Sequence, residues 1–349
     1  SLAFTGRLAK AGIQISMDTR CSTFPMIDEG LAARHGGMRY AERNQPSQRS
    51  GNAAMPLEDF IITLFCWIEE HLNPLIEDNR LRQRGFTPKL TDGEVLTMEV
   101  VGEFLGLDTD QHIWQYFRQH WPLWFPQLGS RTTFAQQAAN LWAIKQQLHQ
   151  QLVLDLGAVA ASIHLVDGCP LPLCVLTRAS RCRVFAGEAD YGYCAAKKQF
   201  YYGFHGHLMV TMDGVITAWT VTPASGDERE ALWDLTDGVQ GLVIGDKGYI
   251  SAFLKAELAA TGIDLQTPLR ANMTDSRPLG VVQRLMTTRR RVETVISQLT
   301  ERFHFEKIRA RDRWHLTNRI ARKVLAHTLG IFVNRLLGRS DLQFERLIA

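Results

Sequence analysis

Two aspartates follow short apolar runs that are typical of buried β-strands. Asp167 closes the run "SIHLVD", and Asp246 follows "GLVIG". A single aspartate at the end of a strand is most often a turn or helix-capping residue. Two such aspartates can instead bind a cation together, provided that their strands are neighbours in one sheet.

The elements between the two aspartates favour that arrangement. The first strand, at 162–167, is followed by β-rich runs at 199–212 and 215–222, which Asp213-Gly214 joins as a hairpin. A helix at 227–237 then leads to the strand that precedes Asp246, and a helix at 250–261 leads to a last short strand. Because a right-handed crossover returns the chain to the same sheet, the first and fourth strands should lie side by side and parallel.

This order of elements is that of an RNase H-like domain. We therefore predict the fold class α/β, with a mixed five-stranded sheet, flanking helices and a separate N-terminal all-helical domain. Adjacent strands lie about 4.8 Å apart, so Asp167 and Asp246 should come close enough to share one cation. Two carboxylates held that close repel each other unless a proton or a metal ion lies between them.

Mg²⁺ suits such a site, because it prefers oxygen ligands and leaves coordination positions for water and substrate phosphates. Two divalent ions about 3.5 to 4 Å apart can activate the attacking oxygen and stabilise the leaving oxygen of a phosphodiester. A third acid is needed, and Glu293 in "RRRVETVISQLTERF" is the candidate. It stands at the margin of an apolar helical stripe, with Arg289 four residues earlier on the same side. Glu301, two turns further on, is the alternative.

The rest of the chain divides by periodicity. Residues 1–54 lack a sustained period and include "RNQPSQRSGNAA", which predicts a flexible or non-native extension. Residues 55–160 have the helical period throughout, and Thr91 with Glu94 forms a capping-box signature. The stretch 130–156 reads as one long amphipathic helix. The aromatic-rich segment 112–125 could stack on bases, although aromatic stripes at helical spacing mostly form core.

The charge of the chain is uneven. The whole chain of 349 residues has 39 Lys and Arg against 36 Asp and Glu, whereas 284–346 holds fifteen against six. This asymmetry indicates a polyanionic partner for the last third, unless the charges only solvate a helix surface. Trp314, between Arg313 and His315, could stack on a base or anchor the core.

The six cysteines do not predict a disulfide framework in a chain of this size. Four of them fall within 169–194, near His205 and His207, which raises the possibility of a zinc site. Their spacings are wider than the close pairs of structural zinc sites, so reduced thiols are the better interpretation. No secretory signal or long apolar run is present in the sequence, and we expect a cytoplasmic protein without a membrane partner.

Taken in order, "HLVDGCPLP", "YYGFHGHLMVTMDGVITAWTVTPASGDERE", "GLVIGDKGY" and "RRRVETVISQLTERF" resemble the motifs of bacterial insertion-sequence transposases of the DDE type. The most similar group is the one numbered nine-eight-two among insertion sequences, and the resemblance covers about 55–349. It implies a catalytic and metal-binding triad of Asp167, Asp246 and Glu293. Two Mg²⁺ ions per active site would be bound there, with Mn²⁺ as a substitute.

The resemblance implies DNA strand cleavage followed by strand transfer, in a bacterial, nucleoid-associated homodimer on double-stranded DNA. Residues 55–160 would help to bind the terminal inverted repeats, 161–310 would form the catalytic domain, and 311–349 would form a basic C-terminal helical segment. The residues expected to contact DNA in terminal repeats and target are Lys247, Arg289, Arg290, Arg309, Arg311, Arg313, Arg319, Arg322 and Lys323.

The sequence departs from the wider family at three places. Related transposases often carry a Tyr-x2-Arg-x3-Glu-x6-Lys signature. Arg289 and Glu293 fit it, whereas Met286 and Thr300 replace the tyrosine and the lysine. His205 stands where a lysine often follows the "YYGF"-like strand, so a phosphate contact there would depend on pH.

Three other readings remain open. An RNase H-like host nuclease, or an inactive DNA-binding remnant of a transposase, would keep the fold without mobility. A phosphatase of the haloacid dehalogenase type would need carboxylates where Cys169 and Ile250 stand. A non-enzymatic interaction module would explain the basic helices but not the two aspartates.

Overall fold

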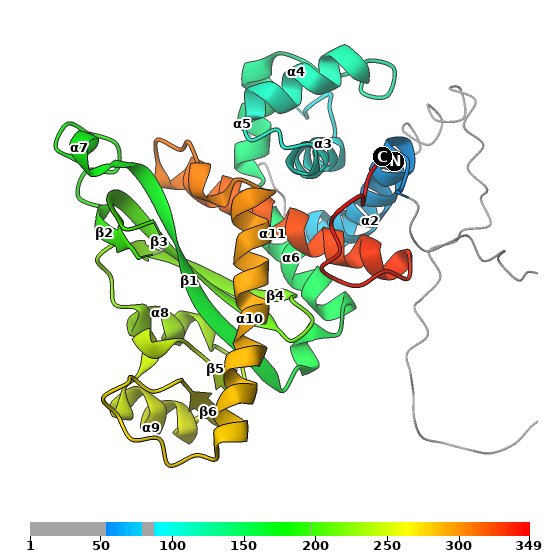
Figure 1. The fold of residues 1–349 in the computed structure, drawn as a ribbon. Helices are drawn as coiled ribbons and strands as arrows, with labels where there is room; N and C mark the ends of the chain where they lie inside the picture. Colours follow the sequence, from blue (N-terminus) through cyan, green and yellow to red (C-terminus); the bar gives the residue numbers. More distant parts are fainter. Residues whose placement is uncertain (1–53, 79–86, 196) are drawn as a thin grey trace, which may run out of the picture.

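A computed structural model describes residues 54–78, 87–195 and 197–349 (Figure 1). The expected N-terminal extension therefore lies, apart from its last residue, outside the described residues. The described chain forms a helical bundle at one end and a curved sheet with flanking helices at the other (Figure 1).

The helical prediction for 55–160 is confirmed within the described residues. The helices are α2 (Leu57–Asp78), α3 (Asp92–Phe104), α4 (Asp110–His120), α5 (Arg131–Asn140), α6 (Trp142–Asp155) and the short η1 (Ala158–Ala160). The single helix expected over 130–156 is wrong. The chain turns at Leu141, which ends α5 and precedes α6, and the leucine side chain is buried in the bundle.

The capping box at the start of α3 and the aromatic-rich segment 112–125 behave as the sequence predicts. Thr91 accepts a hydrogen bond from the backbone N–H of Glu94, and the Glu94 carboxylate accepts one from the backbone of Thr91. Of the aromatic-rich segment, Phe117, Trp124 and Phe125 are buried in the core. The core interpretation of that segment is therefore confirmed for these three side chains.

The long helix α11 (Arg313–Leu336) lies inside the bundle and packs against α3, α5 and α6. From Leu316 to Asn334 nearly all of its residues are buried. Next to the chain end, Met55 and Ile348 form a parallel bridge. The segment 311–349 therefore contains a helix, α11, that is covered by the bundle for most of its length although its sequence is basic.

The sheet contains six strands, not the five expected. They are β1 (Ile163–Val175), β2 (Asp190–Cys194), β3 (Gln199–Thr211), β4 (Ile216–Pro223), β5 (Gly241–Ile244) and β6 (Ile263–Gln266). Their order is β2-β3-β1-β5-β6, and β4 pairs with β3 beyond the part that β2 covers. The sequence predicts that the strand before Asp167 and the strand before Asp246 are adjacent and parallel. This prediction is confirmed, because β1 and β5 pair in parallel.

The additional strand β2 belongs to an insertion between β1 and β3, which also holds the short helix α7 (Leu176–Ala179). The expected hairpin joins β3 to β4. Gly214 has a φ of +87°, in the left-handed region that favours glycine, so a residue with a side chain would be strained at this position of the turn. The connection is longer than two residues, since the ladder resumes at Ile216 after a bulge.

Helices cover both faces of the sheet. α8 (Glu228–Leu235) and α9 (Ala252–Ala260) pack on the face that carries Val166 and Val243. α10 (Leu279–Glu301) runs along the opposite face (Figure 1), and its buried stripe belongs to the same hydrophobic cluster as Leu165 and Ile244. Among the described residues, no helix is long and apolar enough to cross a membrane.

Candidate active site

The register of β1 and β5 brings the two aspartates together. Leu165 pairs with Ile244 at the end of the parallel ladder, so continuing both chains by two residues places Asp167 opposite Asp246. Both side chains have the parity of Leu165 and Ile244 and face α10. The expectation that Asp167 ends its strand is wrong, because β1 continues to Val175 by pairing with β3. It is β5 that stops.

Arg289 of α10 lies among three carboxylates. Its Nη2 donates to Asp167 Oδ2 at 2.7 Å, and its Nη1 lies 3.5 Å from Asp246 Oδ1 and 3.3 Å from Glu293 Oε1. Val292, Val295 and Leu299 form the buried stripe of α10, which leaves Glu293 at its margin. The structure thus brings together the three acids expected from the sequence, around one guanidinium.

Glu301 is not part of this group. Its carboxylate accepts a hydrogen bond from Ser297 on the same helix, two turns from Glu293. The ion pair to Arg289 is made by Glu293. Of the two candidates for the third acid, Glu293 is therefore the one that lies beside the aspartates.

Burial dominates the electrostatics of Asp167. Burial raises the pKa of Asp167 above its ordinary value, although Arg289 and the Gly168 backbone N–H act in the opposite direction. Burial works against the charge of Arg289, but Asp167 and Asp246 outweigh it and raise the pKa of the guanidinium. The cluster therefore favours a cation between its carboxylates.

Glu228, a fourth acid that the sequence reading missed, lies next to this cluster. Burial, followed by the charges of Asp167 and Asp246, raises the pKa of the Glu228 carboxyl. Its Oε1 lies 3.7 Å from Nε2 of His205. A Cβ at Gly248 would come within 2.3 Å of Glu228 Oε2, so the glycine permits this approach. The sequence offered one signal for Glu228, because it is an acidic residue in the first turn of α8, the helix that leads into β5.

The donor set suits a hard divalent cation, although no such site is preformed. Within the described ranges, no group of three His, Cys, Asp or Glu side chains is close enough to hold a metal ion. The Arg289 guanidinium instead stands where a cation would be attracted, with carboxylate oxygens on three sides. Carboxylates are the ligands that Mg²⁺ prefers, so the residues fit the ion if Arg289 moves aside.

The residues expected to contact DNA fall into three groups: exposed, part of the acid cluster, and covered. Lys247, Arg290, Arg309, Arg311 and Arg313 are exposed, while Arg289 belongs to the acid cluster. Arg322 and Lys323 are buried, and Arg319 is largely covered. Trp314 is 45 % exposed, so the suggestion that it anchors the core is wrong.

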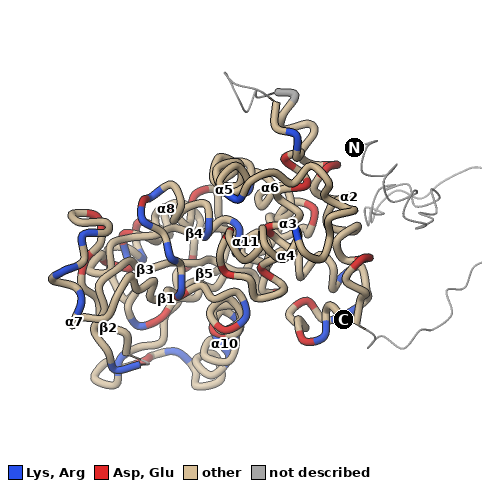
Figure 2. Tube along the Cα trace, turned by 90° about the horizontal axis from the view of Figure 1, so that it is seen from above, with Lys and Arg blue, Asp and Glu red and all other residues tan. Residues whose placement is uncertain are grey.

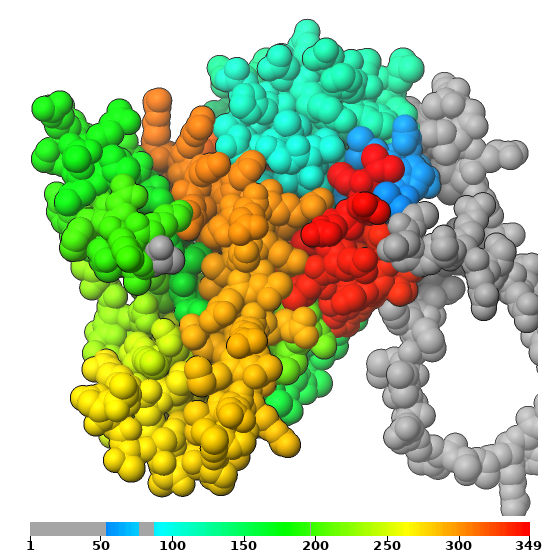
Figure 3. All heavy atoms as spheres, in the orientation of Figure 1, coloured from blue at the N-terminus to red at the C-terminus, as the bar shows by residue number. Residues whose placement is uncertain are grey.

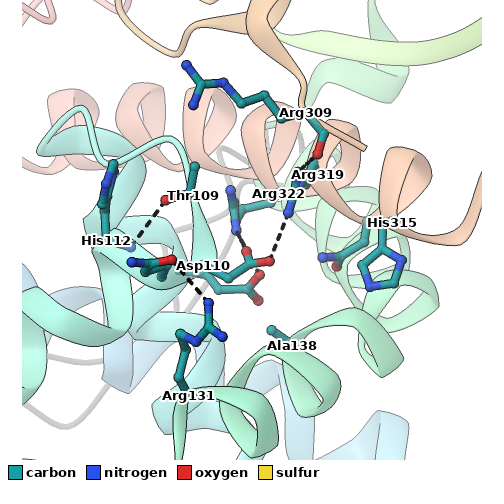
Figure 4. Close-up of polar contacts among 12 residues, drawn as sticks. Thr109, Asp110, His112, Arg131, Ala138, Arg309, His315, Arg319 and Arg322 are labelled. Carbon is teal, nitrogen blue, oxygen red and sulfur yellow. Dashed lines mark hydrogen bonds and ion pairs between the residues drawn. The ribbon is translucent and has the colours of Figure 1, made fainter. Parts of the chain in front are cut away.

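The buried cations are paired with carboxylates inside the helical bundle, and Figure 4 shows the pair of Arg322 with Asp110. Arg322 pairs with Glu99, Glu103 and Asp110, and Lys323 Nζ donates to Glu103 Oε2 at 2.7 Å. A side chain with such partners cannot reach a phosphate. The prediction of DNA contacts at Arg322 and Lys323 is therefore wrong.

Arg319 has a similar position at the edge of this network. It donates to Asp110 Oδ2 at 3.1 Å and to the backbone carbonyl of Arg309. The Arg309 guanidinium extends away from the Asp110 cluster (Figure 4). The expected DNA contact is therefore corrected for Arg319, and it stays a prediction for Arg309.

Five described cysteines, Cys66, Cys169, Cys174, Cys182 and Cys194, are free thiols. Burial raises the pKa of the Cys169 thiol, next to the candidate site, well above its ordinary value. A protonated, buried thiol is a poor metal ligand and a poor nucleophile.

The fold and the site define a mixed α/β protein with a carboxylate cluster where two adjacent parallel strands diverge. Residues 157–313 match the family model described as "Transposase DDE domain". The match spans slightly less than half of the chain, includes all three acids, and supports a DDE transposase.

Among curated proteins, no sequence matches the chain. One solved structure with partial similarity is described as "Cryo-EM structure of piggyBac transposase synaptic complex with hairpin DNA". The identity is 13 %, the TM-score is 0.42, and the alignment covers 87 % of this chain and 81 % of that one.

Proposed function

We propose that the chain is the DDE transposase of a bacterial insertion sequence, with an RNase H-like catalytic domain. It would bind terminal inverted repeats and carry out metal-dependent DNA strand cleavage and strand transfer. The observation that carries this proposal is the convergence of Asp167, Asp246 and Glu293 on Arg289. The family match over 157–313 supports the same conclusion.

Asp167, Asp246 and Glu293 are the residues that would hold Mg²⁺. Bound divalent ions would supply electrostatic stabilisation of the phosphodiester and a more acidic water or hydroxyl. The chain's own contribution is to orient the three carboxylates on rigid elements, two from the sheet and one from α10. Arg289, released from the carboxylates, would be placed to bind a phosphate beside the scissile bond.

Glu228 and His205 border the proposed site on the side of α8. Burial lowers the pKa of His205, which therefore stays neutral at physiological pH. A neutral imidazole neither adds to the cationic charge of the site nor competes for the carboxylates. Its Nε2 lies 3.7 Å from Glu228 Oε1, and we propose that it borders the acids without binding a phosphate as a lysine would.

The test is a nicking assay with purified protein, Mg²⁺ and a plasmid that carries candidate terminal repeats. Asp246→Ala should abolish cleavage and leave duplex binding within about twofold, because Asp246 contacts the cluster and not the basic surface. Glu257→Ala, an exposed acid on α9, is the matched control and should cleave normally. Equal cleavage by wild type and Asp246→Ala would refute the assignment.

A strand-transfer arm separates the transposase from the alternative of a host nuclease. A pre-nicked repeat end with a free 3′-hydroxyl is incubated with target plasmid and Mg²⁺. A transposase should join the end to the target, whereas a nuclease would only cut. Binding without cleavage or joining would indicate an inactive remnant.

A further inference from the structure

The insertion between β1 and β3 presents exposed aromatic side chains. We call Tyr191, Tyr193 and Phe200 the aromatic strip, and these side chains are 48 %, 53 % and 53 % exposed. The rings of Tyr193 and Phe200 lie 4.8 Å apart between centroids, and Tyr191 packs at 5.4 Å on the buried Tyr202. Single exposed apolar residues are ordinary, but a contiguous row of aromatic rings marks an interaction site.

The aromatic strip lies on the same sheet face as the candidate active site. Tyr193 pairs with Phe200 across β2 and β3, and directly opposed residues point to one side. Because side chains alternate along β3, Phe200 shares its face with Leu208, which is opposite Asp167 in β1. The strip and Asp167 therefore face the side of the sheet that carries α10.

The distance from the strip to the site follows from the strand. Eight residues separate Phe200 from Leu208 along β3, which at about 3.3 Å per residue is roughly 26 Å. Each strand of a duplex advances about 3.4 Å per nucleotide, so along a duplex this is about eight nucleotides. A DNA strand that runs from the acids in the direction of β3, outside the side chains that bury Phe204 and Leu208, would reach the aromatic strip within that length.

The surroundings of the strip are basic. Residues 176–200 contain five Lys and Arg and two Asp and Glu. Arg178, Arg181, Arg183 and Lys198 are exposed, and among the described residues these four form no ion pair. Figure 2 shows several Lys and Arg positions along the chain around α7 and β2. The two acids are already engaged, Glu188 with Arg313 and Asp190 with Ser225.

Two ion pairs join the insertion to the start of the basic C-terminal region. Arg313 contacts Glu188, and Lys197 contacts Glu306. The insertion projects from the body beside this region (Figure 3). The exposed Arg309, Arg311 and Trp314 therefore continue the basic, aromatic surface from the insertion onto the start of α11.

We propose that the aromatic strip is a stacking platform for unpaired bases of a DNA strand about eight nucleotides from the cleavage site. This inference rests on the proposed function, since it assumes that the acids act on DNA. Aromatic rings bind bases through their faces, which are accessible only when the bases are not stacked in a duplex, and nearby cations hold the phosphates. Arg178, Arg181, Arg183 and Lys198 provide those cations.

A second copy of the chain fits the surface less well. A symmetric dimer would place the same patch against itself, and four unpaired cations on each side would repel one another. The positive charge around the aromatic strip is complementary to a polyanion such as DNA. Dimer formation through the strip is nevertheless an outcome that the experiment can detect.

The experiment compares binding of fluorescein-labelled oligothymidylate of about 20 nucleotides with binding of a duplex of equal length. The double variant Tyr193→Ala with Phe200→Ala should lose at least about tenfold in affinity for the single strand and keep its duplex affinity. Phe253→Ala, which removes a 70 % exposed aromatic on α9, is the control and should bind both as wild type does. Unchanged single-strand affinity, or equal loss for both DNAs, would overturn the proposal.

Folding and oligomeric state are measured on the same samples. Because the strip side chains are half exposed, the double variant should keep the wild-type melting temperature. If it does not fold, Arg181→Glu with Lys198→Glu keeps the rings and should lower single-strand affinity by at least about tenfold through phosphate repulsion. A variant that changes the monomer–dimer equilibrium, with unchanged DNA affinity, would assign the strip to a second copy and overturn the proposal.

A second arm keeps this inference separate from the proposed function. In the Asp246→Ala background, 2-aminopurine is placed in an unpaired flank about eight nucleotides from the repeat end. Its fluorescence should be quenched by stacking on protein with the intact strip, and not by protein with the double variant. Quenching without any Mg²⁺-dependent cleavage by wild type would reject the proposed function while supporting the platform. Cleavage by wild type without quenching would support the proposed function and reject the stacking platform.

Discussion

At the scale of single residues, Arg289 determines the state of the candidate site. One guanidinium contacts Asp167, Asp246 and Glu293, so the protein itself offsets part of their negative charge. Their side chains are 18 %, 41 % and 54 % exposed, which limits the strength of each pair through solvent screening. A metal ion at the same position would compete with the arginine for the same oxygens.

Replacing Arg289 should reveal that competition without any DNA. Arg289→Ala should lower stability in EDTA by about 1 to 2 kcal/mol, because three carboxylates are left facing one another. Mg²⁺ should then raise the melting temperature of the variant more than that of wild type. Thermal unfolding across a Mg²⁺ series is the measurement, with Arg290→Ala as the exposed neighbour that should resemble wild type. A smaller Mg²⁺ response in Arg289→Ala would contradict the shared position.

At the scale of elements, α11 is a core helix that carries buried cations. Arg322 and Lys323 face α3 and the start of α4, where Glu99, Glu103 and Asp110 supply the counter-charges. Burial alone would raise the pKa of Asp110, but Arg322 and Arg319 outweigh it and lower that pKa to about 2. These ion pairs fix how α11 lies against the N-terminal helices.

Removing the cation at the centre of this network should be costly. Arg322→Met should reduce the free energy of unfolding by about 3 to 5 kcal/mol, since it leaves buried carboxylates without a partner. Urea denaturation at pH 7 measures this. Arg311→Met, an exposed position shortly before the helix, should change stability by less than about 0.5 kcal/mol. Equal stability of Arg322→Met and wild type would show that the buried acids find other partners.

The exposed arginines before α11 should act on DNA instead of stability. Arg309→Ala with Arg311→Ala should weaken duplex binding and reduce the slope of log K against log salt by about 2, one unit for each lost phosphate contact. Fluorescence anisotropy between low and moderate salt gives both quantities. Arg346→Ala, which removes one exposed arginine near the chain end, is the control and should leave the slope unchanged. An unchanged slope would count against phosphate contacts at Arg309 and Arg311.

At the scale of the whole molecule, buried histidines lie where the helical bundle meets the sheet. His149 of α6 hydrogen-bonds the backbone of Ile216 in β4, and burial lowers its pKa to about 4. His327 of α11 lies 3.0 Å from Gln298 of α10, and burial together with His149 lowers its pKa to about 3. Both imidazoles are therefore neutral in the folded protein at neutral pH.

This arrangement predicts acid sensitivity. Above about pH 6.5 these histidines are neutral in the folded and unfolded states, so their contribution to stability is complete. As the pH falls towards 4, the unfolded chain binds protons that the folded chain does not. His149 alone should cost about 2 kcal/mol at pH 5. Urea unfolding of wild type and His149→Gln at pH 7.5 and pH 5 tests this, and the variant should lose less stability than wild type. Parallel losses would assign the effect to other groups.

The sequence by itself determined the features that depend on neighbours along the chain. The apolar runs before Asp167 and Asp246, the Asp213-Gly214 turn and the stripe of α10 beside Glu293 each follow from local periodicity or turn chemistry. Strand adjacency followed from the handedness of the crossover, and the match over 157–313 agrees with the resemblance carried by those motifs. Local patterns were sufficient there because each constrains its own backbone.

Only the tertiary structure decided which charges are buried, and by what. Arg322 and Lys323 look like surface cations in a basic stretch, and the carboxylates that enclose them lie more than two hundred residues earlier. Glu228 joins the acid cluster because α8 packs across the sheet, and Trp314 stays exposed because no element covers it among the described residues. Burial is a property of the assembled chain, so it cannot be read from the residues that flank a side chain.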